Sequence, residues 1–234
     1  MVAARALSLP AVRVPAAILL AITLGMGGLA VGSRAAGAED CVVIEDFAKA
    51  RIGELPAAWK VRKDEGKTVY SVQDEGGLRF LRAVSRGLGV QAAKQHEWDP
   101  AEYPILAWSW RPIEFPAGSD ERGAKTNDSV LAVYAVFPHS PMSVKSLKYV
   151  WSARVPRGTH LTSSRGLTQV RVLRSGTGGA KQWAEERVNV LEDYRKYFGE
   201  TEVPKAAGMA VLTDSDDTKS SAQGDYAKLR LCRS

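Results

Sequence analysis

The chain has 234 residues, of which 45% are hydrophobic, 25% charged and 8% aromatic. This is the composition of a globular protein, and it excludes a disordered or collagen-like chain. The formal net charge is +6, but three of the 32 basic residues lie in the first 38 residues, which contain no acid. The remaining 29 basic and 26 acidic residues nearly balance, so we expect no nucleic-acid partner.

The N-terminal segment has the pattern of an export signal. Residues 1–13 carry two arginines, residues 14–32 are almost entirely apolar or small, and Ala36 and Ala38 then form an A-x-A cleavage site. We therefore expect a signal helix in residues 1–38 and, after cleavage near Ala38, a periplasmic or secreted bacterial protein. The alternative is a retained anchor, because about 19 apolar positions nearly suffice to span a bilayer. The protein would then touch the membrane only through this segment.

Residues 39–234 are expected to form one domain of many short strands. Breaks rich in Gly, Pro, Asp and Ser, such as Asp74–Gly77 and Ser175–Gly179, separate the candidate strands. This spacing is typical of an antiparallel β-sandwich. One helix is predicted at Leu191–Phe198, ended by Gly199 as its C-cap. The predicted strands are Cys41–Asp46, Trp59–Val61, Thr68–Gln73, Leu78–Ser85, Val90–Gln95, Ile105–Pro112, Ser129–Phe137, Ser146–Ser152, Thr168–Arg174, Gln182–Asn189, Ala207–Thr213 and Ala227–Cys232.

The two cysteines stand near the two ends of this domain. In an oxidising compartment a lone pair of cysteines indicates a disulfide. A bridge between Cys41 and Cys232 would close nearly the whole domain and requires the first and last strands to be neighbours. The alternative is two separate buried thiols.

Alternation along two of the strands groups the aromatic residues. Trp108 and Trp110 share one face of their strand, and Tyr149 and Trp151 share one face of theirs. Two roles are open for these side chains. They either stack on the sugar rings of a ligand at a concave face or fill the core of the sandwich, where aromatic residues carry much of the buried area.

A series of short runs along the chain carries a family resemblance. In order, they are Tyr103–Arg111, Asn127–Asp128, Ala132–Phe137, Lys148–Trp151, Trp183–Asn189, Asp193–Tyr194, Phe198–Gly199 and Thr213–Thr218. These runs resemble the domain of unknown function 3047 (DUF3047) family. The resemblance implies an exported protein with the jelly-roll layout of galactose-binding-like domains and carbohydrate-binding modules. It also implies that the segment Ile44–Phe47 lies beside Gly224–Leu231. The sequence departs from the family at Arg86 and Asn127, where a small residue and an acid are usual.

An acidic loop is the sharpest local feature. Asp214, Asp216, Asp217 and the hydroxyl of Thr218 are hard oxygen ligands of the kind that Ca²⁺ uses, so calcium is the candidate cofactor. The alternative is a turn at a strand end in which the aspartates cap backbone amides. A sheet arginine such as Arg111 is a candidate ion-pair partner for these aspartates.

Three functions remain open from the sequence. The first is a non-catalytic binding protein for a glycan or another component of the cell envelope. The second is a carboxylate-dependent hydrolase of a glycan or ester, although the motifs of the common enzyme classes are absent. The third is a structural or interaction protein of the envelope. The candidate ligand-binding residues are Trp108, Trp110, Arg111, Asp128, Tyr134, Tyr149 and Trp151.

Overall fold

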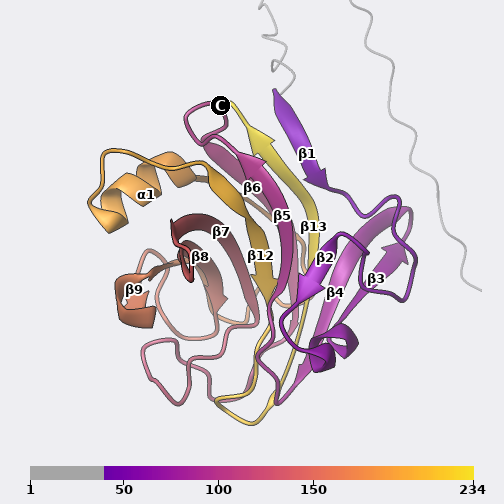
Figure 1. The fold of residues 1–234 in the computed structure, drawn as a ribbon. Helices are drawn as coiled ribbons and strands as arrows, with labels where there is room; N and C mark the ends of the chain where they lie inside the picture. Colours follow the sequence, from indigo (N-terminus) through magenta and orange to yellow (C-terminus); the bar gives the residue numbers. More distant parts are fainter. Residues whose placement is uncertain (1–39) are drawn as a thin grey trace, which may run out of the picture. The chain divides into compact units, whose positions relative to one another are not determined.

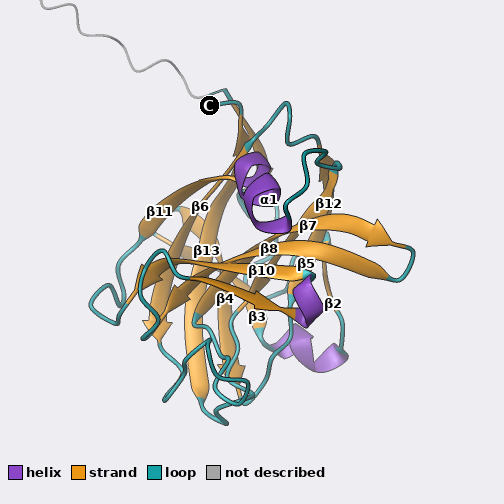
Figure 2. Ribbon diagram, turned by 90° about the vertical axis from the view of Figure 1, so that its left-hand side faces the viewer, coloured by secondary structure: helices purple, strands orange, loops and turns teal. Residues whose placement is uncertain are grey.

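The computed structural model describes residues 40–234, which form two β-sheets packed face to face (Figure 1, Figure 2). The predicted signal segment and its cleavage site lie outside the described residues. No helix of the described part is long and apolar enough to cross a membrane.

Sheet A has six strands. Its order is β11-β6-β13-β4-β3, and β1 pairs with the C-terminal end of β13. All neighbouring strands of sheet A are antiparallel, as predicted. The strands are β1 (Cys41–Glu45), β3 (Tyr70–Glu75), β4 (Leu78–Arg86), β6 (Ile105–Glu114), β11 (Ala184–Asn189) and β13 (Ser221–Cys232).

Sheet B has seven strands in the order β2-β5-β12-β7-β8-β10-β9. One of its pairs, β8 with β10, is parallel, because the chain leaves β8, forms the edge strand β9 and returns antiparallel to β9. The other pairs are antiparallel. The strands are β2 (Trp59–Val61), β5 (Ala92–Trp98), β7 (Leu131–Ser140), β8 (Ser143–Ser152), β9 (His160–Ser163), β10 (Thr168–Ser175) and β12 (Ala206–Leu212).

The connections give the sandwich a jelly-roll layout. The chain passes back and forth between the sheets, and its last two strands insert between earlier ones. Strand β12 lies between β5 and β7 in sheet B, and β13 lies between β4 and β6 in sheet A. The predicted all-β sandwich is therefore confirmed, with one parallel pair that strand alternation could not reveal.

The one α-helix, α1 (Val190–Phe198), joins β11 to β12. Its N-cap residue Asn189 accepts a hydrogen bond from the backbone N–H of Glu192 at 3.0 Å. Its C-cap Gly199 adopts a left-handed φ of 70°, which glycine tolerates without steric cost. The predicted helix is thus confirmed, one residue longer at its start. Two short 3-10 helices cover Asp64–Thr68 and Ser164–Gly166.

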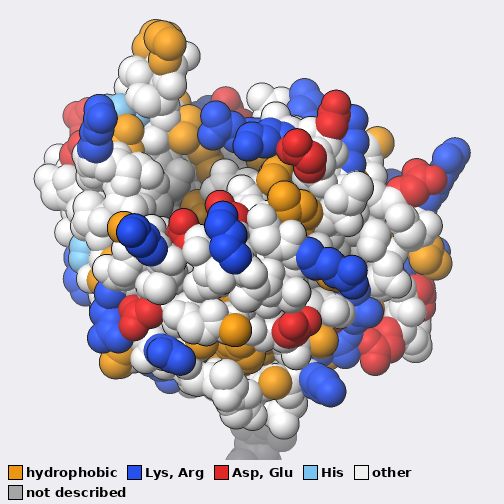
Figure 3. Space-filling model, turned by 90° about the horizontal axis from the view of Figure 1, so that it is seen from below, with side chains coloured by type: hydrophobic (Ala, Val, Ile, Leu, Met, Phe, Trp, Pro, Cys, Tyr) orange, Lys and Arg blue, Asp and Glu red, His pale blue; other side chains and the backbone are white. Residues whose placement is uncertain are grey.

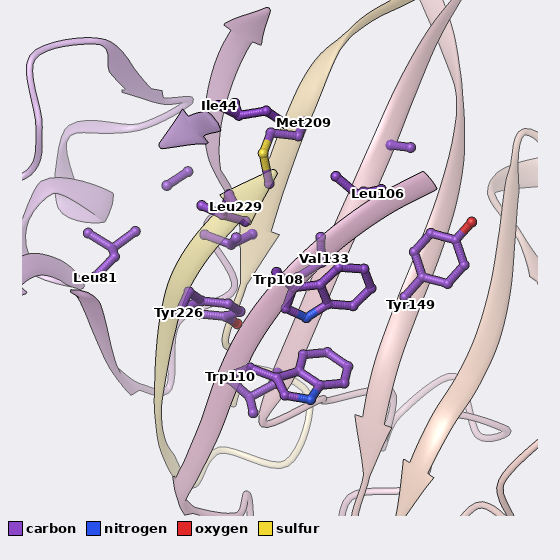
Figure 4. Packing of buried hydrophobic residues seen from close by; sticks show 14 of the residues in the cluster. Ile44, Leu81, Leu106, Trp108, Trp110, Val133, Tyr149, Met209, Tyr226 and Leu229 are labelled. Atoms are coloured by element: carbon purple, nitrogen blue, oxygen red, sulfur yellow. The ribbon is translucent and has the colours of Figure 1, made fainter. Parts of the chain in front are cut away.

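The core lies between the sheets and is rich in aromatic rings. Side chains from β6, β7, β8, β12 and β13 meet there (Figure 4). Trp108 and Trp110 of β6 contact each other edge to face with ring centroids 5.2 Å apart, and Trp108 lies 5.8 Å from the ring of Tyr149. Burial of one such side chain stabilises the fold by roughly 2–3 kcal/mol. The aromatic strand faces therefore hold the two sheets together.

The disulfide between Cys41 and Cys232 is present, as predicted. The two residues are direct partners in the register of β1 and β13, with Cα atoms 4.0 Å apart. The first and last strands of the domain are therefore neighbours, as the bridge requires.

Candidate functional site

The structure resolves the two roles that were open for the paired aromatic residues. Trp108 and Trp110 are 0% exposed, and Tyr149 and Trp151 are at most 4% exposed. All four belong to the core cluster, and Figure 4 shows Trp108, Trp110 and Tyr149 lying between the sheets. Trp108, Trp110 and Tyr149 therefore fill the core, and the expectation that they form a ligand-binding face is corrected. Trp151 also packs in the core, but it lines a hollow of about 450 Å³ together with Arg174 and Trp183.

The opposite, outer face of sheet B carries the surface that remains open. Pairing across five strands places Ala93, Ala210, Tyr134, Lys148 and Val170 side by side in one row. Because side chains alternate along a strand, these residues all leave the sheet on the side away from the core. Tyr134 is thus the one sequence-predicted aromatic ligand residue that the structure places on this outer face.

The next row on the same face is Gln95, Gly208, Val136, Ser146 and Thr168. Residues of the two rows, among them Ala93, Gln95 and Ser146, line the floor of a depression, which we call the groove. It consists of two adjoining hollows of about 710 and 310 Å³. The space-filling view shows the surface hollowed below the segment that projects at its top, with Lys and Arg side chains bordering the hollow (Figure 3).

The walls of the groove come from different parts of the chain. The hollow of about 710 Å³ is bounded on one side by Arg62 and Lys63, which follow β2. On the other side it is bounded by Ser164, Leu167 and neighbouring residues of β8 and β10. Lys60 and Lys94 line the smaller hollow. A β-sandwich core thus positions a groove whose two walls differ in charge.

Small side chains keep the floor low. Ala93 is exposed, and Gly208 sits at an irregularity in the pairing of β12 with β5. A Cβ atom on Gly208 would come within 2.4 Å of the backbone oxygen of Lys94. Glycine is therefore required there by the close approach of the two strands, and the groove gains room as a result.

Tyr134 lies over a buried cation. The Nζ of Lys148 is 5.8 Å from the centre of the Tyr134 ring, and the Lys148 side chain is buried. Burial opposes the charge on Lys148, but the attraction of Tyr134, Asp214 and Glu121 outweighs it and raises the pKa of Lys148. Lys148 therefore stays protonated beneath the groove floor and links the groove to the acidic residues behind it.

Those acidic residues form a cluster at the end of sheet B. One carboxylate oxygen each from Asp128, Asp214 and Asp216 lies within 4.8 Å of the others. We call these three residues the acidic cluster. The structure thus brings together two of the predicted calcium ligands and adds Asp128, which the sequence placed among the ligand-binding residues. Asp216 lies directly against Gly89, where a Cβ atom would meet its Oδ1 at 2.2 Å.

The other two predicted calcium ligands have a different role. Thr218 donates two hydrogen bonds to Oδ2 of Asp128, from its backbone N–H at 2.8 Å and from its hydroxyl at 2.5 Å. The backbone N–H of Asp217 donates to Oδ1 of Asp128 at 3.2 Å. These bonds are those of a capped turn, in which a carboxylate satisfies free backbone donors. Asp128, which precedes β7, therefore fixes the conformation of the loop that follows β12.

Asp214 carries an unusual proton affinity. It accepts a hydrogen bond from the backbone N–H of Ser129 at 2.6 Å. Burial, with repulsion from Asp128 and Asp216, raises the pKa of Asp214 to about 7, against the attraction of Lys148 and the Ser129 bond. Burial and neighbouring negative charge both disfavour the ionised form of a carboxyl group, which is why the shift of Asp214 is upward. The donor set consists of hard oxygen ligands and so fits a calcium ion as well as a proton.

Arg111, predicted as a ligand-binding residue and as a partner of the acidic loop, lies elsewhere. It is on the outer face of sheet A, where its Nε donates to Oδ2 of Asp225 at 2.8 Å and its Nη2 to Glu75 at 2.6 Å. Arg82 binds the same buried Asp225 through two hydrogen bonds. The expected pairing of Arg111 with the acidic loop is therefore wrong, because Asp225 and Glu75 engage its guanidinium group instead.

The groove offers little for acid-base chemistry. Within the described part of the chain, no Asp or Glu lines either of its hollows. The histidines are apart from one another on β5, β7 and β9, and the ring of His160 stacks on Tyr197 at 4.2 Å. General acid catalysis needs a proton donor within hydrogen-bond reach of the bond that breaks. The described lining of the groove therefore offers hydroxyl, amide and cationic side chains rather than carboxyl groups.

Several groove residues were missed from the sequence. Lys148 and Ser146 could have been found, because they occupy the polar face of a strand whose other face is aromatic, opposite Tyr134. Arg62 and Lys63 gave no signal, since a basic pair after a short strand is ordinary surface. Only the order of the strands in sheet B shows that Arg62 and Lys63 lie on the other side of the groove from β8.

The fold was compared with solved structures. The family 11 carbohydrate-binding module of the cellulosomal cellulase Lic26A-Cel5E of Clostridium thermocellum aligns with a TM-score of 0.44 and 8% identity, over 84% of this chain and 96% of the module. A mutant of the carbohydrate recognition domain of Emp46p aligns with a TM-score of 0.42 and 12% identity, over 82% and 95% of the two chains. The family 11 xylanase from Neocallimastix patriciarum aligns with a TM-score of 0.40 and 10% identity, over 84% and 100%.

Among curated proteins, none matches this chain. The family described as "Protein of unknown function (DUF3047)" matches residues 57–230, which is most of the chain and includes the runs that carry the sequence resemblance. The protein therefore belongs to the DUF3047 family.

Proposed function

We propose that this protein is an exported, non-catalytic binding protein that holds a glycan of the cell envelope in the groove on the outer face of sheet B. The observation that carries the proposal is the groove itself. It is open along the sheet, its floor is lowered by Ala93 and Gly208, and its two hollows together extend across six strands. An open, elongated depression suits an extended chain better than a small enclosed ligand.

The chemistry of the lining supports a glycan. The side chains of Gln91, Gln95, Ser146 and Thr168 offer amide and hydroxyl groups that both donate and accept hydrogen bonds. Sugar hydroxyls have the same dual character. The ring of Tyr134 adds one apolar surface at the floor. A site of this kind binds by many modest polar contacts, as expected for a polymer of hydroxylated rings.

Hydrolysis is the weaker candidate. A glycosidase places two carboxyl groups on either side of the bond that it cleaves. The acidic cluster contains carboxyl groups at short distance, but Asp128 and Asp214 are buried and engaged by backbone N–H groups, and neither lines the groove. Binding without cleavage is therefore the function that we propose.

Export is part of the proposal. It is supported by the signal pattern of residues 1–38 and by the disulfide between Cys41 and Cys232, a bond that persists in oxidising compartments. Expression of the full chain in a Gram-negative host tests it. We expect the protein in the periplasmic fraction with Glu39 as its first residue, as read by N-terminal sequencing. Recovery of the uncut chain in the cytoplasm would contradict export.

Binding is tested by blocking the groove. Purified protein is titrated by affinity electrophoresis against two glycans of the bacterial envelope, soluble peptidoglycan strands and lipopolysaccharide O-chains, and against dextran and polygalacturonate. Ala93→Trp places a large ring in the open groove without disturbing the core, because Ala93 is exposed. We expect the variant to bind at least about tenfold more weakly than the parent, a loss of roughly 1.4 kcal/mol.

The matched control is Ala48→Trp, which puts the same ring into a hollow beside sheet A. It should bind as the parent does. Equal weakening by both variants would point to a general effect on folding, which thermal melting detects independently. Failure of every polysaccharide to retard the parent protein would reject the proposed function.

A further inference from the structure

We propose that the ligand of the groove is an anionic polysaccharide, a glycan that carries carboxylate, sulfate or phosphate groups along its chain. This inference rests on the proposed function and narrows it to one ligand class. It follows from the distribution of charge around the groove.

One wall of the groove is cationic. Lys60, Arg62 and Lys63 come from a four-residue stretch at the end of β2, all three are exposed, and they line the two hollows. None has an ion-pair partner among the described residues. By contrast, Lys94 of β5, which also lines the groove, is held by Glu45 with Nζ 2.6 Å from Oε2. Three positive charges on this wall are therefore available to a ligand.

The acidic residues close to the groove do not cancel these charges. Asp64, next along the chain, pairs with Lys67 at 2.7 Å. Asp214 is buried beside Lys148, and Asp216 lies behind Gly89, so the acidic cluster contributes no lining side chain. A depression bordered by one sign of charge concentrates counter-ions and favours ligands of the opposite sign.

The other wall is neutral and polar. It presents the hydroxyl of Ser164 beside the apolar Val144 and Leu167, and Ser146 and Thr168 add hydroxyls on the neighbouring floor. A ligand that fits both walls carries negative charge along one edge and hydroxyl groups along the other. A linear polysaccharide with one charged group on each sugar, or on alternate sugars, has this arrangement.

The lining favours a polysaccharide over other polyanions. Proteins that bind single-stranded nucleic acids stack bases on accessible aromatic rings. Tyr134 is the one aromatic residue in the described lining of the groove and is only 6% exposed. The groove instead offers hydroxyl and amide groups, which recognise sugars by hydrogen bonding.

The test compares polymers that differ in charge alone. Full-length protein is titrated with polygalacturonate and with its methyl ester, and with dextran sulfate and dextran, at low and high NaCl. We expect each acidic polymer to bind more tightly than its neutral counterpart and to lose affinity as salt rises. The double variant Arg62→Gln, Lys63→Gln should weaken binding of the acidic polymer by about tenfold and leave the neutral polymer unaffected.

The matched control is the double variant Lys49→Gln, Lys125→Gln. It removes the same charge at two exposed positions outside the groove lining and should keep the affinity of the parent. Equal affinity for acidic and neutral polymers would overturn the inference and leave the proposed function standing. Absence of binding to any polysaccharide would overturn both. Tighter binding to an oligothymidylate, or to vesicles of phosphatidylglycerol, would also overturn it in favour of another polyanion.

Discussion

Two buried aspartates of this domain are neutralised in different ways. Asp225 is fully buried on sheet A and lies between Arg82 and Arg111, whose guanidinium groups occupy its oxygens at 2.8 to 3.0 Å. Asp214 on sheet B has no guanidinium beside it. It is held by the N–H of Ser129 and attracted by Lys148, while two other carboxylates repel it. The first is balanced by arginines, and the second by a proton near neutral pH.

This difference predicts how stability depends on pH. The pKa of Asp214 is raised from 3.8 to about 7 in the folded protein. Between these values the folded state binds a proton that the unfolded chain has released. The stability contributed by Asp214 is therefore complete below pH 3.8 and is lost as the pH rises through 7. At about 1.4 kcal/mol for each pKa unit, the loss amounts to roughly 4 kcal/mol.

Asp214→Asn isolates this contribution, because asparagine cannot ionise and can still accept the bond from Ser129. We expect the variant to match the parent near pH 4 and to exceed its free energy of unfolding by a few kcal/mol at pH 8, as measured by urea denaturation. Glu202→Gln, an exposed position, is the control and should change neither value. A parent protein as stable at pH 8 as the Asn variant would show that the cluster does not destabilise it.

Calcium can be examined in the same experiment. A divalent ion held by Asp128, Asp214 and Asp216 would relieve the repulsion that a proton otherwise relieves. In that case calcium raises the melting temperature of the parent at pH 8, EDTA reverses the change, and Asp214→Asn responds to neither. An unchanged melting temperature in all three conditions would leave the proton as the balancing charge.

At the scale of single elements, α1 is specified by its ends. The side chain of Asn189 caps its first turn, and Gly199 ends it in a left-handed conformation. Asn189→Ala should lower the free energy of unfolding by about 1 kcal/mol, because it leaves the N–H of Glu192 without its acceptor. Asn189→Asp keeps an acceptor and should retain stability. Equal losses for both variants in urea titrations would mean that the cap contributes nothing.

Elements with such local signals could be predicted from the sequence. Strand β2 and helix α1 were located to within one residue. Strand β9, His160–Ser163, was missed because it is short and polar, and β10 rather than its own composition holds it in the sheet. Strand β13 was predicted from Ala227 but begins at Ser221, since its polar first half includes Asp225, which is stabilised there by arginines from β4 and β6.

The site was harder to predict, for a related reason. Alternation separates the two faces of a strand but does not say which face meets the other sheet. Trp108 and Tyr149 face inward, and Tyr134 faces outward, although all three lie in apolar strands. Arg62, which follows the edge strand β2, also lines the groove. No pattern in the sequence around Arg62 shows that it lies near Tyr134 of β7 or Ser146 of β8.

At the scale of the whole domain, the jelly-roll order determines where these features meet. Because β12 inserts between β5 and β7, the loop that follows it brings Asp214 and Asp216 to Asp128, which precedes β7. Because β13 runs through the middle of sheet A, its last residue reaches β1. One wrapping of the chain thus assembles the acidic cluster behind the groove and joins the two ends of the domain.

The joined ends give the last prediction. The disulfide links residues that are 191 positions apart, so its loss restores conformational freedom to nearly the entire unfolded domain. The loop-closure relation puts the stabilisation at about 5 kcal/mol as an upper value.

The double variant Cys41→Ala, Cys232→Ala should unfold at a lower urea concentration than the oxidised parent, and addition of dithiothreitol should bring the parent to the level of the variant. The variant itself should not respond to the reductant. Because β13 is the only described strand with which β1 pairs, amide exchange in Cys41–Glu45 of the reduced protein should accelerate before exchange in the rest of the sheet. If oxidised and reduced parent unfold at the same urea concentration, the pairing of β1 with β13 holds the ends together without the covalent bond.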